Sequence, residues 1–446
     1  MSKIIKLCKG LDIRLQGEAA KSIVNAPLAA EYAVSPLDFE GLTPKVLVKV
    51  GDKVEAGSPL FFDKKRPEIL FTSPVSGTVA AVNRGEKRRV LSVVVTADKE
   101  VAYKEFAKLD VATASREQIV NLLLESGLWT MFVQRPYGVI ASPSDMPKAI
   151  FVSAFDSAPL ATDYSFALAG EEKSLQKGFE VLGRLTEGKV HLSYHASQAA
   201  PQFSGVELHT FKGKHPAGNV GVQIHHIDPI NKGEKVWTLN IQDVAILGRL
   251  FLNGKVDMSR VIAVAGSCVA EPKYYKVIAG ASVASILGGG LSNEHARVIS
   301  GNVLTGRNVG KEGFLGVNAN TLTAIPEGDT YEMLGWAMPR FKKFSVSRAY
   351  FSWLFPWCKY NLNTNLNGGE RAFVTNDLYE KYLPMDVYPV HLVKACLAND
   401  LDKMENLGIY EVIEEDLALC EFVCPSKIEI QQILRNGINT MIKEEE

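Results

Sequence analysis

The chain is 446 residues long, a length at which globular proteins divide into several domains instead of building one hydrophobic core. Its 46% apolar and 22% charged residues exclude a disordered or collagen-like chain, and its formal net charge of -1 excludes a general attraction to nucleic acids or anionic lipids. No stretch reaches the roughly 20 consecutive apolar residues of a membrane-spanning helix, and no apolar signal region follows the first charged residues. We therefore expect a protein of the cytoplasm.

Residues 45–97 show a pattern of short β-strands separated by turns that contain glycine. Two stretches, residues 51–57 and 73–79, resemble the paired motifs of the biotinyl and lipoyl carrier fold. Carriers of that fold bear a modified lysine on the hairpin between the motifs, where this sequence has Arg66. The resemblance therefore implies a lipoyl/biotinyl-carrier-like β module without a covalent cofactor.

From about Leu109 onward, helical and strand patterns alternate. Ser115 and Gln118 form a capping box, because the serine hydroxyl can accept from the third helical N–H while the glutamine reaches back to the cap. The apolar run 149–152 is typical of a strand that is buried on both faces. The other predicted elements are helices at 171–185 and 244–252 and strands at 191–194, 206–210, 237–240 and 260–264. This alternation predicts a Rossmann-like α/β domain with a parallel sheet.

The α/β region lacks the motifs of nucleotide-binding and catalytic sites. Residues 306–312 miss both the spacing and the Ser or Thr of a P-loop, and no Gly-x-Gly-x-x-Gly sequence follows an early strand. Residues 214–218 follow a strand, where α/β sheets bind ligands, but their composition is that of a loop. The one histidine cluster is His225 and His226 with Asp228. Neighbouring residues of a strand point to opposite faces, so we interpret this cluster as a structural turn and not as a metal site.

Strand patterns return after Ala265, around Val298 and Leu322, with one helix predicted at 274–287. This combination favours a small α+β unit of the β-grasp type. The predicted domains are residues 1–100 for the N-terminal segment and carrier-like module, 101–256 for the Rossmann-like domain, 257–330 for the β-grasp-like domain and 331–446 for a helical C-terminal domain.

The C-terminal domain is predicted to contain helices over residues 387–402 and 427–444. Before them, residues 348–360 carry at least five aromatic side chains beside basic residues. Two interpretations are open for this stretch. It forms a core helix whose aromatic face packs inward, or it forms a surface that contacts partner subunits or lipid headgroups.

The six cysteines are scattered along the chain, as expected for reduced thiols and not for a disulfide framework. Cys420 and Cys424, the latter followed by a proline, match the end of an iron–sulfur motif. A cubane cluster needs four thiolates, however, and the next cysteine upstream is Cys396, 24 positions before Cys420. We expect a pair of buried cysteines on a helix instead.

The order of these modules, together with residues 45–79, 367–372 and 414–427, resembles the NqrA family of the Na⁺-translocating NADH:quinone oxidoreductase. That family is related to the flavin- and NADH-binding subunit of respiratory complex I and to the RnfC subunit of the Rnf complex. Where those relatives have a glycine-rich flavin loop, residues 127–137 carry bulky side chains, and their cysteine cluster is reduced to two cysteines. The resemblance therefore implies a subunit without its own flavin or iron–sulfur cluster.

The resemblance further implies a peripheral subunit on the cytoplasmic side of the bacterial inner membrane, which reaches the membrane through the other subunits of the complex. It would take part in binding ubiquinone or menaquinone, whose reduction by NADH drives Na⁺ export. The complex as a whole is a translocase, and we expect little catalysis from the isolated chain. No nucleic acid is expected as a partner.

Quinone pockets need apolar or aromatic walls and one or two hydrogen-bond donors for the carbonyl groups. The candidate residues that supply these groups are Trp129, Phe132, Arg135 and Tyr137 in the altered loop and Tyr32 and Leu37 nearer the N-terminus. One alternative is that Trp129 and Phe132 belong to the core. A second is a structural docking subunit that binds no small molecule, and a third is an Rnf-like electron carrier, which requires the visible absorbance of a flavin or cluster.

Overall fold

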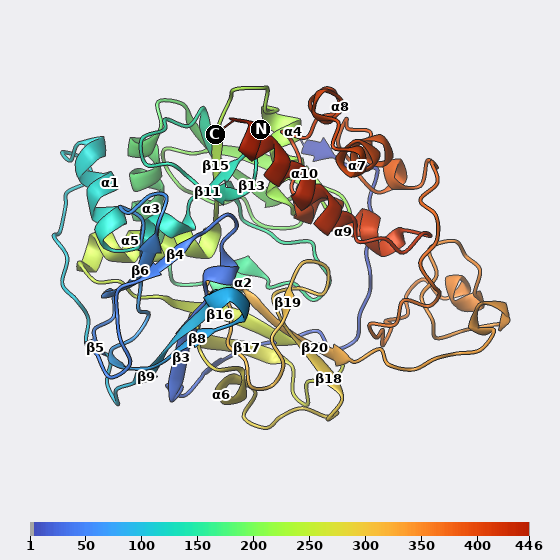
Figure 1. Cartoon of the computed structure of the whole chain (residues 1–446), viewed down its shortest axis with the longest axis horizontal. Helices are drawn as coiled ribbons and strands as arrows, with labels where there is room; N and C mark the ends of the chain where they lie inside the picture. The colour runs from blue at the N-terminus through green and yellow to red at the C-terminus, as the bar shows by residue number, and fades with distance from the viewer. Residues whose placement is uncertain (1–3, 446) are drawn as a thin grey trace.

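The structure is a computed structural model, and it describes residues 4–445 of the chain. These residues form β-sheets of seven, six, four and three strands. Figure 1 shows an α/β part and the C-terminal helices in the upper half, β-rich parts in the lower half, and a long irregular segment that extends to the right. None of the described helices is long and apolar enough to cross a membrane.

The seven-stranded sheet forms the centre of the α/β part. Its first five strands are mutually parallel, and a hairpin of two strands pairs antiparallel with the fifth. The strand order is β1 (Ile4–Lys6), β14 (Glu207–Lys212), β13 (Lys189–His195), β12 (Ala149–Ser153), β15 (Val236–Asn240), β10 (Val133–Arg135) and β11 (Val139–Ile140). The strands predicted at 149–152, 191–194, 206–210 and 237–240 are confirmed.

Helices cover both faces of this sheet, which is why the central strand β12 is apolar almost throughout. On one face Leu192 and Leu239 share a core with α3 (Glu172–Leu185) and α5 (Ile241–Asn253). On the other face Phe151 packs with Ile224 of α4 (Val220–Ile227). The remaining helices here are α1 (Arg116–Glu125), which begins at the predicted capping box, and α2 (Tyr164–Ala167).

Two glycines allow α3 and α5 to cross in close contact. A Cβ atom added to Gly248 would lie 1.7 Å from the carbonyl oxygen of Ser174, and one added to Gly178 would lie 2.2 Å from the carbonyl oxygen of Val244. Because both neighbours are backbone atoms, a larger residue at either position requires one helix to shift. Gly183 lies on the same helix α3, and a Cβ atom there would meet nothing within 4 Å.

The N-terminal β module consists of two small sheets, as the strand pattern of residues 45–97 predicts. One sheet is β3 (Glu31–Val34), β9 (Val90–Ala97), β8 (Gly77–Arg84) and β5 (Lys53–Val54), and the other is β4 (Pro44–Val46), β6 (Pro59–Asp63) and β7 (Leu70–Thr72). Arg66, at the position of the carrier lysine, pairs with Asp63 at 3.3 Å and donates to the carbonyl oxygen of Ile140 at 2.8 Å. This position therefore links the hairpin between β6 and β7 to the α/β part.

The six-stranded sheet corrects one predicted element. Its order is β19 (Arg307–Asn308), β18 (Ala296–Ser300), β20 (Thr321–Pro326), β16 (Ser259–Ala265), β17 (Lys273–Ile278) and β2 (Ala20–Asn25). The helix predicted at 274–287 is wrong, because β17 pairs along its length with β16 and only α6 (Val283–Leu287) is helical. Tyr274 and Val277 are buried, and Gly280, at a φ of +81°, turns the chain after the strand. Pairing with two neighbouring strands here overrides the local helical pattern.

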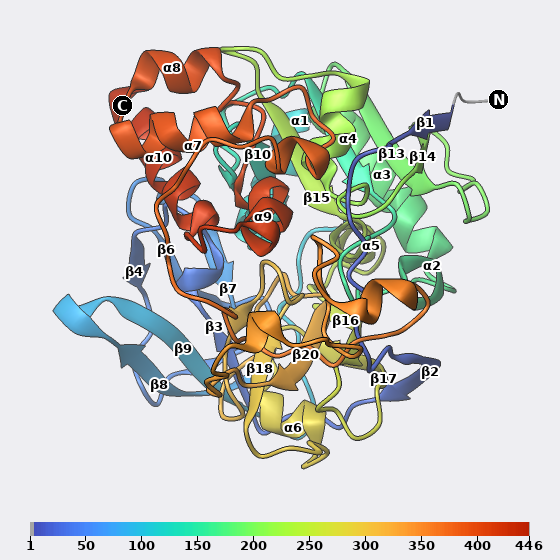
Figure 2. The same cartoon turned by 90° about the vertical axis from the view of Figure 1, so that its right-hand side faces the viewer.

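Residues 4–25 run through two sheets that are otherwise built from later parts of the chain. β1 pairs with β14, and β2 pairs with β17. Figure 2 shows both dark-blue strands, β1 beside β14 and β2 beside β17. The domain boundaries at residues 100, 256 and 330 stay predictions, and this N-terminal segment connects the parts that they separate.

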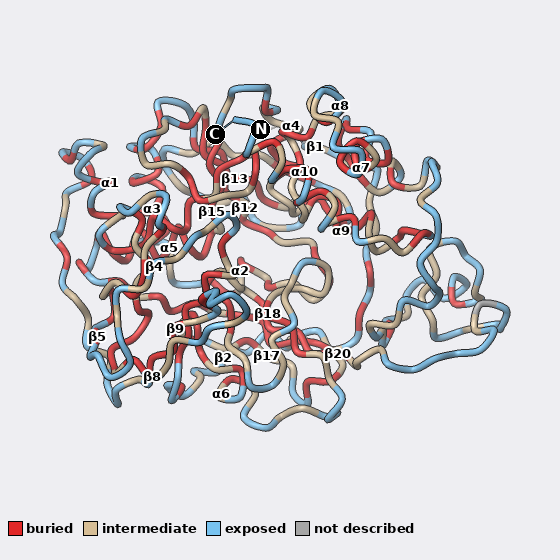
Figure 3. The backbone as a smooth tube through the Cα atoms, viewed as in Figure 1, coloured by how far each residue is buried: buried red, intermediate tan, exposed pale blue. Residues whose placement is uncertain are grey.

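The C-terminal helices begin later than predicted. They are α7 (Pro389–Ala398), α8 (Leu401–Asn406), α9 (Glu414–Val423) and α10 (Ile430–Glu445), which confirms helices at 387–402 and 427–444. The expected helical character is wrong for residues 331–386, which contain only the short 3₁₀ turns η4 (Gly335–Ala337), η5 (Phe351–Leu354) and η6 (Tyr379–Lys381). Figure 3 shows much of this segment as a pale-blue, exposed tube on the right. Most described side chains of residues 331–378 are exposed, so this part lacks the buried face on which helices in proteins depend.

We predict that Gly248→Ala lowers the midpoint of thermal unfolding. The added methyl group must push α3 and α5 apart, at a cost of about 1–3 kcal/mol. Gly183→Ala is the matched control, since its open position on α3 leaves only the better helix propensity of alanine, up to about 1 kcal/mol of stabilisation. Circular dichroism melts of the two variants test this difference, and equal shifts of both would contradict it.

Candidate functional site

A cavity of about 310 Å³ lies at the carboxyl ends of β12 and β15, the edge at which parallel sheets bind ligands. Ser153 and Asn240 are the last residues of these two strands, and both line the cavity. Asn302 and Leu304 contribute from the loop after β18, and Glu415 contributes from α9. The cavity therefore lies where the α/β part, the six-stranded sheet and the C-terminal helices meet.

The cavity walls combine apolar side chains with hydrogen-bonding groups. The Tyr164 hydroxyl accepts hydrogen bonds from the side-chain amides of Asn240, at 2.8 Å, and Asn320, at 3.3 Å, and neither bond uses its own O–H hydrogen. The apolar wall residues are Met131, Val133, Phe155, Val220, Leu239, Leu304 and Ile413. Such a lining suits a small, largely apolar molecule that carries hydrogen-bond acceptors.

His215 is a second potential donor at the cavity wall. Its Nδ1 lies 3.1 Å from the Ser157 hydroxyl, and its buried Nε2 has no hydrogen-bond partner among the described residues. Burial lowers the pKa of His215 to about 4, so the imidazole is neutral at neutral pH. Ser157 accepts from the N–H of Gly218 at 2.8 Å and can donate to Nδ1, which places the imidazole proton on Nε2.

Two carboxyl groups give the cavity an acidic character. Burial raises the pKa of Asp156, which has no ion pair among the described residues. Burial also raises the pKa of Glu415 to about 7, and repulsion from Asp416 and Asp156 adds to this against the attraction of Arg135. The Glu415 side chain is 37% exposed, and it lines the cavity. Since the folded chain holds the Glu415 proton above the ordinary pKa of 4.5, the contribution of this group to stability falls as the pH rises from 4.5 through about 7.

Arg135 connects the cavity to the C-terminal helices. Its side chain is 1% exposed, and its Nη1 donates to Oδ2 of the equally buried Asp416 at 2.6 Å while Nη2 donates to Glu415. Gly221 of α4 leaves room for this ion pair, because a Cβ atom there would lie 2.3 Å from the Arg135 guanidinium. The guanidinium is thus engaged by protein carboxylates at the cavity wall.

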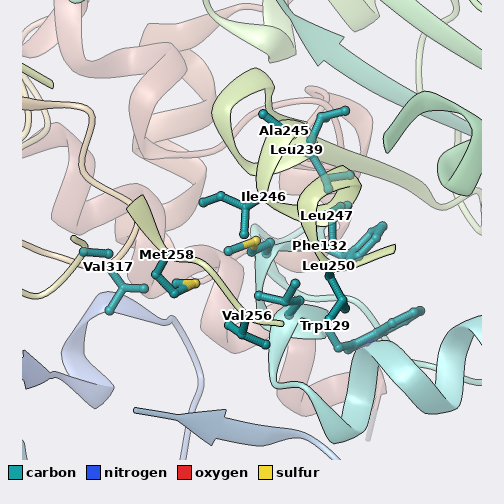
Figure 4. Packing of buried hydrophobic residues seen from close by; sticks show 14 of the residues in the cluster. Trp129, Phe132, Leu239, Ala245, Ile246, Leu247, Leu250, Val256, Met258 and Val317 are labelled. Atoms are coloured by element: carbon teal, nitrogen blue, oxygen red, sulfur yellow. The ribbon is translucent and has the colours of Figure 1, made fainter. Parts of the chain in front are cut away.

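Trp129 and Phe132, the first of the predicted quinone residues, lie in the protein core (Figure 4). Their rings stack with centroids 4.9 Å apart, and the ring of Trp237 meets that of Trp129 edge-on at 5.3 Å. The indole N–H of Trp129 donates to the carbonyl oxygen of Ala141 at 2.8 Å. Both side chains therefore have the contacts expected from the core interpretation, and neither lines the cavity.

The remaining predicted residues lie at separate places. The Tyr137 hydroxyl donates to Glu445 at the end of α10. Tyr32 is buried in β3 of the N-terminal module, and Leu37 lies half-buried in the 3₁₀ turn η1 (Pro36–Asp38). Of the six candidates, Arg135 alone lines the cavity.

Sequence reasoning does not single out Tyr164, Asp156 or His215 as site residues. The sequence feature that could have indicated them is their position, because each of the three follows the carboxyl end of a strand of the parallel sheet. The loop 214–218 has this position, and its residues His215 and Gly218 do line the cavity.

His225 and His226 lie in the last turn of helix α4 and not in a strand, which corrects the structural basis given for them. Nδ1 of His225 lies 2.6 Å from a carboxylate oxygen of Glu411, and Nε2 of His226 lies 2.8 Å from the carbonyl oxygen of Pro384. Both histidines thus contact the C-terminal region, consistent with a structural role.

The predicted pair of buried cysteines is confirmed. Cys420 lies on α9 and Cys424 follows it, and both are buried free thiols. The Tyr379 hydroxyl donates to Sγ of Cys424 at 2.9 Å. Burial raises the pKa of Cys420, and it raises the pKa of Cys396 to about 11, so these two thiols stay protonated at neutral pH.

Comparisons with known proteins connect this architecture to one family. Family models match for the NqrA N-terminal barrel-sandwich hybrid domain over residues 5–98, the NqrA second alpha/beta domain over residues 114–256 and the NQRA C-terminal domain over residues 261–311. The first match agrees with the two small sheets of the N-terminal module.

Curated relatives match along the whole chain. Proteins named as the A subunit of Na(+)-translocating NADH-quinone reductase are 39% identical in Cellvibrio japonicus and 40% identical in Hahella chejuensis, each over 99% of this chain and 100% of the relative. The protein of the same name from Neisseria meningitidis serogroup B is 39% identical over the same shares. A solved chain of an NAD⁺-reducing [NiFe]-hydrogenase in the air-oxidized state aligns over 77% of this chain and 67% of its own length at 12% identity, with a TM-score of 0.34, which is too low to indicate a common fold.

We predict that Arg135→Met destabilises the protein by about 3–5 kcal/mol, because Asp416 is left as a buried charge without a cation. The double variant Arg135→Met/Asp416→Leu should regain most of this loss, since it buries no unpaired charge at the pair. Thermal unfolding and limited proteolysis of the C-terminal helices measure both variants. A double variant no more stable than Arg135→Met would show that electrostatic pairing is not what holds α9 to the sheet.

Proposed function

The chain belongs to the NqrA family, and we propose on this premise that it acts as the A subunit of a Na⁺-translocating NADH–quinone reductase. In this role it is a peripheral subunit on the cytoplasmic side of the inner membrane and is attached through the other subunits. NADH oxidation and Na⁺ export then belong to the assembled complex. The full-length match to relatives of that name supports the proposal.

The observation that carries the docking role is an exposed apolar surface on residues 331–357, which we call the aromatic segment. Tyr331 is 93% exposed and Trp357 is 68% exposed. The other exposed large apolar residues of the segment are Met333, Leu334, Met338, Phe341, Phe351, Trp353, Leu354 and Phe355. So many large apolar side chains on one surface segment mark an interaction site, since isolated soluble proteins keep such patches small.

Basic groups accompany the aromatic side chains of this segment. The Arg348 guanidinium lies over the Trp353 ring, 5.7 Å from its centroid. Aromatic side chains and arginine are the residue types enriched where subunits meet. The aromatic segment therefore supports attachment to partner subunits of the complex, which is one of the two interpretations left open by the sequence.

We predict that the double variant Phe355→Ser/Trp357→Ser releases the chain from the complex. The two side chains make their main contribution to the partner, so co-purification with the membrane subunits should fall at least tenfold while the thermal unfolding midpoint stays unchanged. Val50→Ser/Tyr388→Ser, which removes exposed apolar side chains elsewhere, is the matched control. If the double variant co-purifies fully at an unchanged unfolding midpoint, the aromatic segment is not part of the docking surface.

We further propose that the chain takes part in binding quinone and that the cavity holds the quinone head group. Its apolar walls suit the ring, and Tyr164 and His215 offer the O–H and N–H donors that quinone carbonyls need. Of the six candidate residues predicted from the sequence, Arg135 alone lines the cavity, and its guanidinium is paired with Asp416 and Glu415. The alternative is a docking subunit that binds no small molecule.

We predict that a short-chain ubiquinone quenches the tryptophan fluorescence of the isolated chain, because Trp237 adjoins the cavity residue Thr238. Tyr164→Phe removes one hydroxyl donor and should weaken binding about tenfold, the value of one hydrogen bond of about 1.4 kcal/mol. Tyr274→Phe, which removes another buried tyrosine hydroxyl, is the control and should bind as the wild type does. A wild-type chain without quenching, or photolabels confined to other segments, would favour the docking-only role.

We also propose that the chain carries no flavin, iron–sulfur cluster or covalent group of its own. Bulky core side chains occupy residues 128–132, and the high pKa of Cys420 opposes cluster ligation. The lipoyl/biotinyl-carrier-like, Rossmann-like and β-grasp-like assignments of the three β-containing parts, and the kinship with complex I and Rnf, belong to the same proposal. A colourless purified chain is expected, and visible absorbance of a flavin or cluster would contradict it.

A further inference from the structure

Three metal-ligating side chains lie together on the α4-covered face of the seven-stranded sheet, away from the cavity. Nδ1 of His191 on β13 lies 2.9 Å from Nε2 of His209 on β14 and 3.7 Å from Oε2 of Glu207. Each of the three offers one ligand atom, and these atoms all lie within 4.8 Å of one another. Among the described residues this is the one group of three such side chains.

The parallel pairing of β13 and β14 produces this arrangement. His191 is paired with Glu207, and His209 lies two positions further along the same strand and so on the same face. The ring of His191 stacks on Phe151 at 4.6 Å, which fixes its orientation. The three side chains are therefore placed by the sheet and not by a mobile loop.

The electrostatics leave both imidazoles neutral and able to act as ligands. Burial lowers the pKa of His191 to about 4, and the neighbouring His209 adds to this. Burial also lowers the pKa of His209. The pKa of Glu207 is lowered, first by its hydrogen bond with Lys189, so its carboxylate is ionised. Two neutral imidazoles and one carboxylate form the ligand set of open zinc sites.

We propose that His191, His209 and Glu207 bind a divalent transition-metal ion of the zinc type. Ligands about 2.0–2.1 Å from a tetrahedral ion are about 3.3 Å apart, and the two measured separations lie on either side of this value. Binding requires only that the proton shared by the two imidazoles move to the outer nitrogen of its ring, a change of tautomer without loss of a proton. The Glu207 side chain is 44% exposed, so solvent can supply the fourth ligand.

Lys189 would compete with this ion for the Glu207 carboxylate. Its ammonium lies 2.5 Å from Oε1 of Glu207, while Oε2 is the oxygen that faces His191. The Lys189 charge repels a cation, and Asp228, which acts on His191 with the opposite sign, attracts one. Removing the lysine charge should therefore strengthen metal binding, whereas a histidine pair that serves only as a hydrogen bond predicts no such gain.

The test is isothermal titration of the full-length, chelator-treated chain with ZnCl₂, followed by CoCl₂ titration to read the visible absorption of a bound cobalt ion. The wild type should bind one ion per chain, and zinc should raise its thermal unfolding midpoint. His209→Ala and Glu207→Gln should each weaken binding at least tenfold, and Lys189→Gln should strengthen it. His195→Ala, which removes another histidine from β13, is the matched control and should bind as the wild type does.

A wild-type chain that binds no zinc at micromolar concentration would overturn the proposal. So would unchanged binding by Glu207→Gln together with His209→Ala, because the ion would then sit elsewhere on the chain. Glu207→Gln alters a half-exposed side chain and is expected to keep the fold, so the test remains decisive even where His209→Ala unfolds.

Discussion

The ion pair between Arg135 and Asp416 is the constraint on which the relation between the sheet and the C-terminal helices depends. Both side chains are almost completely buried, and a buried charge is tolerated only beside a partner that neutralises it. Arg135 is on strand β10 and Asp416 is in the first turn of α9, where the helix dipole also favours a negative charge. The pair therefore joins strand β10 to helix α9 across about 280 positions of the chain.

The character of the cavity follows from this pair. The guanidinium holds Glu415 as well as Asp416, which keeps the Glu415 side chain at the cavity wall. One cation then stands against two carboxylates, and Asp156 adds a third without an ion pair among the described residues. Burial raises the pKa of Asp156, and burial together with repulsion from Asp416 and Asp156 raises the pKa of Glu415. A neutral ligand with acceptor groups suits this environment better than an anion does.

The sequence was sufficient to predict the elements that depend on a local residue pattern, such as the buried strand β12 and the helix capped by Ser115. The prediction was wrong where pairing with distant residues determines the structure. The residues of β17 form a strand because they pair with β16 and β2. Arg135 was selected as a donor for a ligand, but its partners come from α9, about 280 positions away, which no local pattern reveals. The sequence did not predict the group of His191, Glu207 and His209 for the same reason. These side chains lie close together only because of the register between two strands.

A shared core gives the parts of the chain a fixed relation to one another. One continuous cluster of buried residues includes Phe61 of the N-terminal module, Phe179 of α3 and Val298 of the six-stranded sheet. Movement of any of these parts against the others would expose apolar surface to water at a cost of about 25 cal/mol per Å². The aromatic segment, by contrast, extends from this body with most of its large side chains in solvent. A body with one shared core and one exposed apolar segment is suited to hold a fixed position in an assembly.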